Sequence, residues 1–244
     1  MTLDLARMQT RLTEAFITKM VAANPSILLP SGNLRLPPAR LSFPNLAKKG
    51  TATNDDGTPR EGSFGANLLF TPDADLTAAA MERKKKLAEF FPTNPTGAGM
   101  KSPFRDQADR VAPSEGGQNV KGKTTTGYVP GAKFITPNAN RRPSLSTLVN
   151  GKAAAFLGSD DEIEKTFYAG CWVVPFVNVF HGRNAKNPGA FFGLQGVLKV
   201  CDDTEFGGTS MDMNEAAAGL TIDGSFDPAS SFSTGTGEPE DIFA

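Results

Sequence analysis

The sequence predicts a mainly β fold, a small closed barrel of five strands that one helix interrupts. The chain of 244 residues holds 25 glycines and 18 prolines, and this richness in turn-forming residues favours short strands over a helical bundle. Several short segments alternate apolar and polar residues, which is the pattern of half-buried strands. The apolar share of 39% lies close to that of globular proteins, so the chain can bury one sizeable core.

The first 38 residues are predicted to form an arm that is set apart from the domain that follows. Residues 3–22 carry apolar side chains at helical spacing, with Thr2 as the N-cap, and predict an amphipathic helix. Four prolines in residues 24–38 prevent this helix from continuing and indicate an extended connector. The helix either packs onto its own domain or forms a contact in a homo-oligomer.

Five strands are predicted in a domain that spans residues 39–208. Their bounds are residues 39–46, 63–70, 126–136, 166–181 and 190–201. The helix lies between the second and third strands, begins at the cap Thr71 and ends before Pro92. Its basic run at residues 83–86 spreads around the helix and is interpreted as a solvated face, with a nucleic-acid contact as the alternative.

The fourth strand carries the clearest alternation of side chains. One set is interpreted as core: Phe167, Ala169, Cys171, Val173, Val177 and Val179. The other set forms an aromatic-rich face that either packs beneath another layer or stacks on a flat ligand: Tyr168, Trp172, Val174, Phe176, Asn178 and Phe180. Pro175 indicates an edge or a bulge in this strand, because proline lacks the N–H that a strand ladder needs.

The formal net charge of -1 hides two segments of opposite sign. All 25 lysines and arginines and 16 of the 26 acids lie in residues 1–201, which leaves an excess of nine positive charges there. The other ten acids lie in residues 202–244, and residues 209–244 are predicted to be an acidic, flexible tail. Between Lys101 and Arg142 eight bases outnumber three acids. A basic excess of this kind attracts phosphate groups and indicates a polyanionic partner.

Several function classes are disfavoured by what the sequence lacks. The single histidine, His181, cannot complete a two-histidine zinc site and leaves little for a histidine-dependent triad. Cys171 and Cys201 have neither C-x-x-C spacing nor a disulfide framework around them. We therefore expect no metal, no cofactor and no enzymatic activity. The lack of an apolar signal segment or membrane span predicts a cytoplasmic protein.

Residues 117–124 (GQNVKGKT) match the phosphate-binding loop G-x-x-x-x-G-K-T of NTPases. That loop works only between a buried strand and a helix N-terminus, which direct backbone N–H groups at the phosphates. Here residues 111–116 do not resemble a strand, and residues 124–130 are β-branched and end at a proline. We therefore reject an NTPase and interpret the lysines of this segment as part of a nucleic-acid path.

Four stretches, taken in order, resemble a tailed-phage family of single-stranded DNA-binding proteins that is related to podovirus helix-destabilising proteins. They are ARLSFPNL at residues 39–46, SPFRD at 102–106, FYAGCW at 167–172 and FGLQGVLK at 192–199. The resemblance covers roughly residues 39–208 and implies an OB-fold that binds single strands without sequence preference, in phage DNA replication, recombination or repair. Residues 1–38 lie outside it, and residues 107–125 and 145–159 depart from the family pattern.

A second resemblance concerns the end of the chain, because EPEDIFA at residues 238–244 looks like the acidic, phenylalanine-ended tips of bacterial single-stranded DNA-binding proteins. It implies that the tail recruits replication or recombination proteins through Glu238, Glu240, Asp241, Ile242 and Phe243. A merely solubilising tail is the alternative. The opposite charges of tail and body lead to a further hypothesis, that the tail competes with DNA for the basic groove.

Binding a single strand without reading its sequence requires cations for the phosphates and flat rings for the bases. The candidate phosphate contacts are Arg105, Arg110, Lys121, Lys123, Lys133, Arg141 and Arg142. The candidate stacking residues are Trp172, Tyr168, Phe176 and Tyr128. The competing interpretation is a phage virion structural or assembly protein that self-associates through the N-terminal arm.

Overall fold

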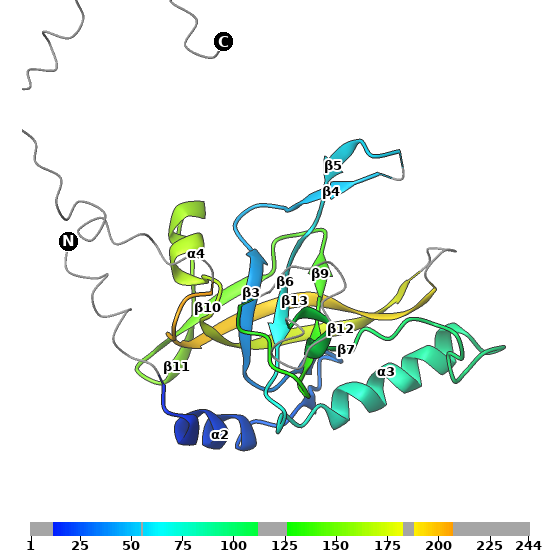
Figure 1. Ribbon diagram of the computed structural model, residues 1–244, viewed down its shortest axis with the longest axis horizontal. Helices are drawn as coiled ribbons and strands as arrows, with labels where there is room; N and C mark the ends of the chain where they lie inside the picture. Colours follow the sequence, from blue (N-terminus) through cyan, green and yellow to red (C-terminus); the bar gives the residue numbers. More distant parts are fainter. Residues whose placement is uncertain (1–11, 55, 112–125, 183–187, 207–244) are drawn as a thin grey trace, which may run out of the picture. The chain divides into compact units, whose positions relative to one another are not determined.

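The computed structural model describes residues 12–54, 56–111, 126–182 and 188–206 (Figure 1). All of them belong to the first of two compact units of the chain, Met1–Gly207. The acidic tail, the first part of the predicted N-terminal helix and the NTPase-like residues 117–124 lie outside the described residues. Within the described ranges, no helix is long and apolar enough to cross a membrane.

Five strands form a closed ring. β12 (Trp172–Gly182) and β13 (Gly189–Cys201) are the longest, and they pair with each other antiparallel. β3 (Ala39–Asn45) pairs with β12 and with β6 (Phe64–Leu69), and β9 (Asn138–Ala139) connects β6 to β13. The order β12–β3–β6–β9–β13 therefore returns to β12. The predicted mainly β fold with five strands around one core is confirmed, although the ring contains β9 in place of the predicted strand at residues 126–136.

Eight shorter strands in the described residues accompany the ring. They are β1 (Ile27–Leu28), β2 (Leu34–Arg35), β4 (Thr51–Thr53), β5 (Pro59–Glu61), β7 (Arg105–Asp106), β8 (Lys133–Ile135), β10 (Ser144–Val149) and β11 (Lys152–Ala155). β2 pairs with β12, β10 pairs in parallel with β13, and β11 pairs with β10. The order β2–β12–β13–β10–β11 is therefore one continuous sheet. The β4–β5 hairpin is a separate two-stranded sheet, and Figure 1 shows it projecting from the ring.

Two segments in which the sequence predicted no strand contain strands. The extended connector at residues 24–38 contains β1 and β2, and the insertion at residues 145–159 contains most of β10 and all of β11. Leu34 and Leu36 are fully buried in the same core as residues of β3 and β6. This part of the connector is therefore built into the core.

The described part of the predicted N-terminal helix starts at Glu14. In the described residues, α2 (Glu14–Ala22) follows Thr13, whose backbone is extended and whose hydroxyl accepts a hydrogen bond from the Phe16 N–H at 3.3 Å. A threonine in this position satisfies an N–H that the first turn leaves free, which is what an N-cap does. A single helix through residues 3–22 is therefore wrong at Leu12 and Thr13.

The helix between β6 and β7 begins later than predicted. α3 (Thr77–Phe90) starts six residues after Thr71, so Thr71 is not its cap. The Asp75 carboxylate instead accepts from the Thr77 N–H at 2.9 Å, and the Ser26 hydroxyl accepts from the Ala78 N–H at 3.1 Å. The predicted end of the helix before Pro92 is confirmed.

The fourth predicted strand begins six residues too early. Residues up to Thr166 form α4 (Asp160–Thr166), whose N-terminus has a reciprocal capping box between Ser159 and Glu162. The strand itself, β12, starts at Trp172. A register shift between Phe176 and Val177 next to Pro175 confirms the predicted bulge.

The third predicted strand is much shorter than residues 126–136. Gly127 and Gly131 both have positive φ, at 86° and 80°, and the chain turns between them. Only Lys133–Ile135, which is β8, pairs with β6.

The core fills the ring, and much of the predicted core set lies in it. Phe167, Cys171, Val173 and Val177 are buried, while Val179 is half-buried against the same cluster. A smaller cluster outside it contains Leu69, Val111, Tyr128 and Phe134. It supports the surface on which Arg105 lies.

Candidate nucleic-acid interface

A groove of about 490 Å³ lies where the far end of the β12–β13 pair meets β7 and the segments around β8 and β9. It combines cationic, aromatic and neutral polar side chains. Among the residues that line it are Lys101, Arg105, Thr136, Asn138, Phe180 and Phe191. The first two supply positive charge and the last two supply flat rings.

Two of the rings that line the groove, Phe180 and Phe191, come from facing positions on the long strand pair. Phe180 of β12 and Phe191 of β13 are cross-strand partners, and their ring centroids lie 6.2 Å apart. Both side chains are only half-buried. The next residue, Phe192, points to the core side, where its ring meets Phe104 edge to face at 5.3 Å. Because successive side chains of a strand point to opposite faces, Phe180 and Phe191 face the groove while Phe192 packs toward the core.

Helix α3 packs against β12 and β13 at the groove end of this strand pair and holds it in place (Figure 1). The His181 ring stacks on Phe90 at 5.1 Å and meets Phe91 edge to face at 4.7 Å. The Arg83 guanidinium donates to the backbone oxygens of Ala190 at 3.2 Å and Lys101 at 3.5 Å. Burial lowers the pKa of Arg83. Arg83 of the basic helical run therefore holds the groove wall together, and is not part of a solvated face.

Arg105 is held in place by both its ring contact and a chain of hydrogen bonds. Its guanidinium lies over the Phe134 ring at 4.4 Å and donates to the Thr136 hydroxyl at 2.5 Å. Thr136 donates to Asn67 at 2.6 Å, and Asn67 donates to the Tyr128 hydroxyl at 2.7 Å. Burial, followed by the charge of Arg110, lowers the pKa of Arg105, yet a guanidinium stays charged in proteins. Arg105 is thus an oriented cation at the groove, with further N–H groups available.

The four other predicted phosphate contacts that the structure describes lie outside this groove. Lys133 pairs with Asp106 at 3.1 Å, and Arg142 pairs with Asp160 at 2.6 Å while also donating to the Ala47 carbonyl. Arg110 and Arg141 are exposed. Lys121 and Lys123 lie outside the described residues. Among the described residues, Arg105 is the one predicted phosphate contact that lines the groove.

Three of the four predicted stacking residues are buried. Trp172 is 2% exposed and its indole N–H donates to Asp203 at 2.8 Å. Tyr168 hydrogen-bonds through its hydroxyl to Asp202 and to the backbone of Asp203, and Tyr128 packs edge to face on Phe134 at 5.4 Å. The structure therefore corrects the prediction that these three rings stack on bases. Polar partners and neighbouring layers cover them, which the alternation of residues alone could not show. Phe176 is half-buried and lines a different pocket.

The sequence did contain a signal for the residues that were missed. Phe180 belongs to the same alternating face as Phe176, and Phe191 is the first of two adjacent phenylalanines at the start of the last strand. Only the pairing of β12 with β13 shows that these two rings face each other. Lys101 and Asn138 approach them from other elements.

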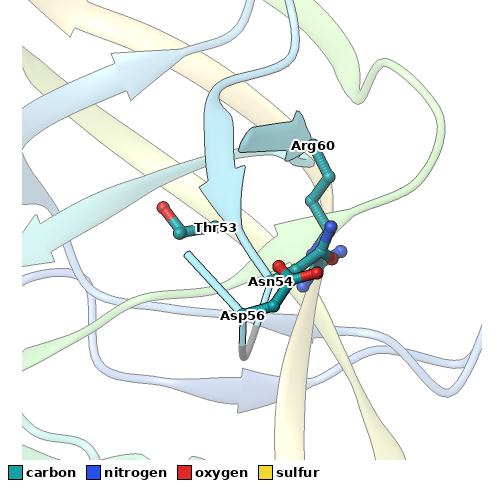
Figure 2. A pocket seen from close by; sticks show the side chains of 4 residues that line it. All are labelled: Thr53, Asn54, Asp56 and Arg60. Carbon is teal, nitrogen blue, oxygen red and sulfur yellow. The ribbon is translucent and has the colours of Figure 1, made fainter. Parts of the chain in front are cut away.

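Two other hollows differ from the groove, because carboxylates form part of their lining. One of about 840 Å³, beside the N-terminal end of α2, is lined by Arg40, Trp172, Asp203 and Phe206 among others, and Arg40 already lies 4.0 Å over the Phe206 ring. The other lies at the β4–β5 hairpin, where Figure 2 shows Arg60 directed toward Asn54 and Asp56. There, hydrogen bonds from Thr58 lower the pKa of Asp56. No aromatic ring of the described part of the chain lines this second hollow.

Compared with protein-family models and with curated proteins, the chain matches none. Its fold is similar to that of the single-stranded DNA-binding protein from bacteriophage Enc34, with a TM-score of 0.52 at 22% identity over 78% of this chain and 93% of the other. The structure of that protein in complex with single-stranded DNA gives a TM-score of 0.53 at 24% identity over 75% of this chain and 93% of the other. The chain therefore has the OB-fold-like architecture that the sequence resemblance implied.

Proposed function

We propose that this chain binds single-stranded DNA without reading its sequence, through the groove between Arg105 and the Phe180–Phe191 ring pair. The observation that carries the proposal is the meeting of two half-buried rings with Lys101 and Arg105 in one groove. The likeness of the fold to a phage single-stranded DNA-binding protein supports it.

The chemistry of the groove suits a single strand better than a duplex. Exposed rings stack on any unpaired base, and each stacked base contributes about 1–3 kcal/mol. Lys101 and Arg105 attract the phosphates that connect those bases. The bases of a duplex are already stacked on one another, so the rings gain nothing from it. Binding of this kind needs no catalytic group, metal or cofactor.

Further cations extend this interface in the proposal. Arg110 lies on the short helix η1 (Gln107–Arg110), close enough to Arg105 to lower its pKa, and is exposed. Lys121, Lys123 and Arg141 are proposed as further phosphate contacts on the strength of their charge and position in the sequence. Lys133 and Arg142 contribute less, because each already pairs with a carboxylate.

The biological role that we infer is the protection of exposed strands during phage DNA replication, recombination or repair, in the cytoplasm of the host. The acidic residues 209–244 recruit partner proteins in this proposal, with residues 238–243 as the contact segment. The same tail competes with DNA for the groove, since its charge is opposite to that of the body.

Fluorescence anisotropy with labelled oligo(dT) and a duplex of equal length tests the proposal. We expect the wild type to bind the single strand more tightly, and the double variant Phe180→Ala/Phe191→Ala to lose at least about ten-fold in affinity. Phe16→Ala is the matched control, because Phe16 is 49% exposed on α2 and does not line the groove. Equal affinity for the duplex, or an unchanged double variant, would contradict the proposal.

A further inference from the structure

The face of the β12–β13 pair that carries Phe180 and Phe191 continues beyond the groove. Cross-strand partners lie on the same face of a sheet, so the register of β12, β13 and their neighbours defines rows across it. Moving along β13 from the groove, the rows are Phe180–Phe191, then Asn178–Gly193–Asn138, then Phe176–Gly196–Ser144. The face therefore has phenylalanine rings at both ends and amide side chains between them.

Glycines occupy the middle position of the second and third rows. A Cβ at Gly193 would collide with the Asn178 Oδ1, and one at Gly196 would lie 3.2 Å from the Ser144 backbone oxygen. Neither glycine has the positive φ that would require glycine for conformational reasons. Glycine weakens the interior of a strand, and it often marks a site where a ligand approaches the backbone closely. Neither glycine carries a side chain, so the strip along β13 between the side chains of β12 and those of β9 and β10, which we call the trough, is covered at Gly193 by the Asn178 side chain and is hollowed beside Gly196.

A pocket of about 290 Å³ lies at the far end of this trough. Phe176 supplies a ring, and the polar groups around it are the side chains of Asn33, Ser144, Ser146 and Gln195. Among the residues that the structure describes, no charged side chain lines the pocket. Amide and hydroxyl groups offer both donors and acceptors, which matches the edge of a nucleobase.

The spacing of the two ring positions suits one continuous strand of DNA. Phe176 and Phe180 are four residues apart on β12, which corresponds to about 13 Å along a β-strand. Between them, the Asn178 Oδ1 is buried with no hydrogen-bond partner among the described residues. Beside Phe176 on β2, the Nε of Arg35 is likewise buried and unpartnered. Unpaired buried polar atoms are costly, and these two belong to the same face as the rings, Asn178 between Phe176 and Phe180 and Arg35 beside Phe176.

We propose that the trough receives bases of the same single strand that occupies the groove, and that the pocket at Phe176 takes one unstacked nucleobase. This inference rests on the proposed function. The base stacks on Phe176 while its edge meets the hydroxyl and amide groups of Ser144, Ser146 and Gln195. Short strands then occupy only the groove at Phe180 and Phe191. The pocket at Phe176 contributes to binding when the strand is long enough to reach it.

Anisotropy titrations with oligo(dT) of increasing length, from about 4 to about 16 nucleotides, test this inference. Phe176→Ala removes the ring, and Gly196→Val fills the trough. We expect each variant to bind the longest strand at least about five-fold more weakly than the wild type and to bind the shortest one equally well. Thr147→Val is the matched control, because Thr147 neighbours Ser146 on β10 but points to the other face.

An abasic site moved stepwise along the longest strand adds a second readout that does not depend on the stability of the variants. In the wild type, the affinity for the strand should fall when the abasic site is at one position beyond the groove. In Phe176→Ala, an abasic site at that position should leave the affinity unchanged. Phe176→Leu keeps an apolar side chain without the ring and serves if Phe176→Ala unfolds. Equal weakening of short and long strands, or no weakening of either, overturns the inference. A wild type without affinity for any single strand would instead refute the proposed function itself, and the inference with it.

Discussion

The indole N–H of Trp172 donates to the Asp203 carboxylate at 2.8 Å, and both side chains are buried. The same carboxylate accepts from the Thr204 N–H at 2.7 Å and lies 3.6 Å from the Arg40 guanidinium. Arg40 in turn donates to the Thr204 carbonyl at 2.6 Å. This pair therefore fastens the segment after β13 onto the ring.

Asp203→Ala should destabilise the protein without changing its affinity for DNA. The substitution leaves the buried indole N–H without its acceptor and removes a charge-assisted bond, which together cost about 2–3 kcal/mol. Urea unfolding, followed by the fluorescence of the single tryptophan, measures the loss. Glu205→Ala is the control, because Glu205 is an exposed acid in the same segment. A folded Asp203→Ala protein with much weaker DNA binding would place this pair in the interface.

The burial of Trp172 shows which part of the structure alternation can predict. The pattern in residues 172–181 correctly separated two faces of a strand, and Val173 and Val177 lie in the core as predicted. It could not show which face another layer covers. The carboxylate that holds Trp172 lies 31 residues further along the chain, at a separation that local patterns do not reach.

The missed elements have local causes. α4 was signalled by Ser159 and Glu162, which form a capping box, but the apolar residues that follow were interpreted as an early start of the strand. β9 consists of two residues and β11 of the sequence KAAA, so neither carries the β-branched side chains by which strands are recognised. The groove depends on β9 and on the β12–β13 register, so it could not be assembled from the sequence.

The salt dependence of DNA binding should distinguish Arg105 from Arg142. Each phosphate contact to a single strand contributes a slope of about −0.7 in a plot of log K against log salt. Arg105→Ala should therefore make the slope less steep by about 0.7. Arg142→Ala should leave the slope unchanged and lower the free energy of unfolding by about 1 kcal/mol, because Arg142 is already paired with Asp160. Equal slopes for Arg105→Ala and the wild type would remove Arg105 from the phosphate path.

The two cysteines should make the protein less stable at alkaline pH. Burial raises the pKa of the Cys171 thiol to about 12 and that of Cys201 to about 11, from 9.0. Above pH 9.0 the unfolded chain therefore loses these protons while the folded chain keeps them, and the free energy of unfolding falls as the pH rises. Each thiol contributes at most about 1.4 kcal/mol per pH unit.

Urea unfolding under reducing conditions from pH 8 to about pH 11 checks this expectation. Cys171→Ala should flatten the alkaline fall more than Cys201→Ala, since Cys171 is fully buried and Cys201 only half-buried. Burial also raises the pKa of Tyr168, so a smaller fall should persist in the double variant. An unchanged slope in Cys171→Ala would mean that its thiol ionises as readily in the folded protein as in the unfolded one.

Removing residues 209–244 should tighten DNA binding at low salt. These residues contain seven acids and no lysine or arginine, while residues 1–201 carry an excess of nine positive charges. A tethered polyanion competes with phosphates for the same cations, and salt screens the competition beyond about 10 Å at 0.1 M. The truncated and full-length chains should therefore differ in affinity for oligo(dT) at low salt and converge as salt is added. A full-length variant with the seven acids changed to their amides separates charge from length and should behave like the truncation. Unchanged or weaker binding by both variants at low salt would rule out competition and leave recruitment of partners as the role of the tail.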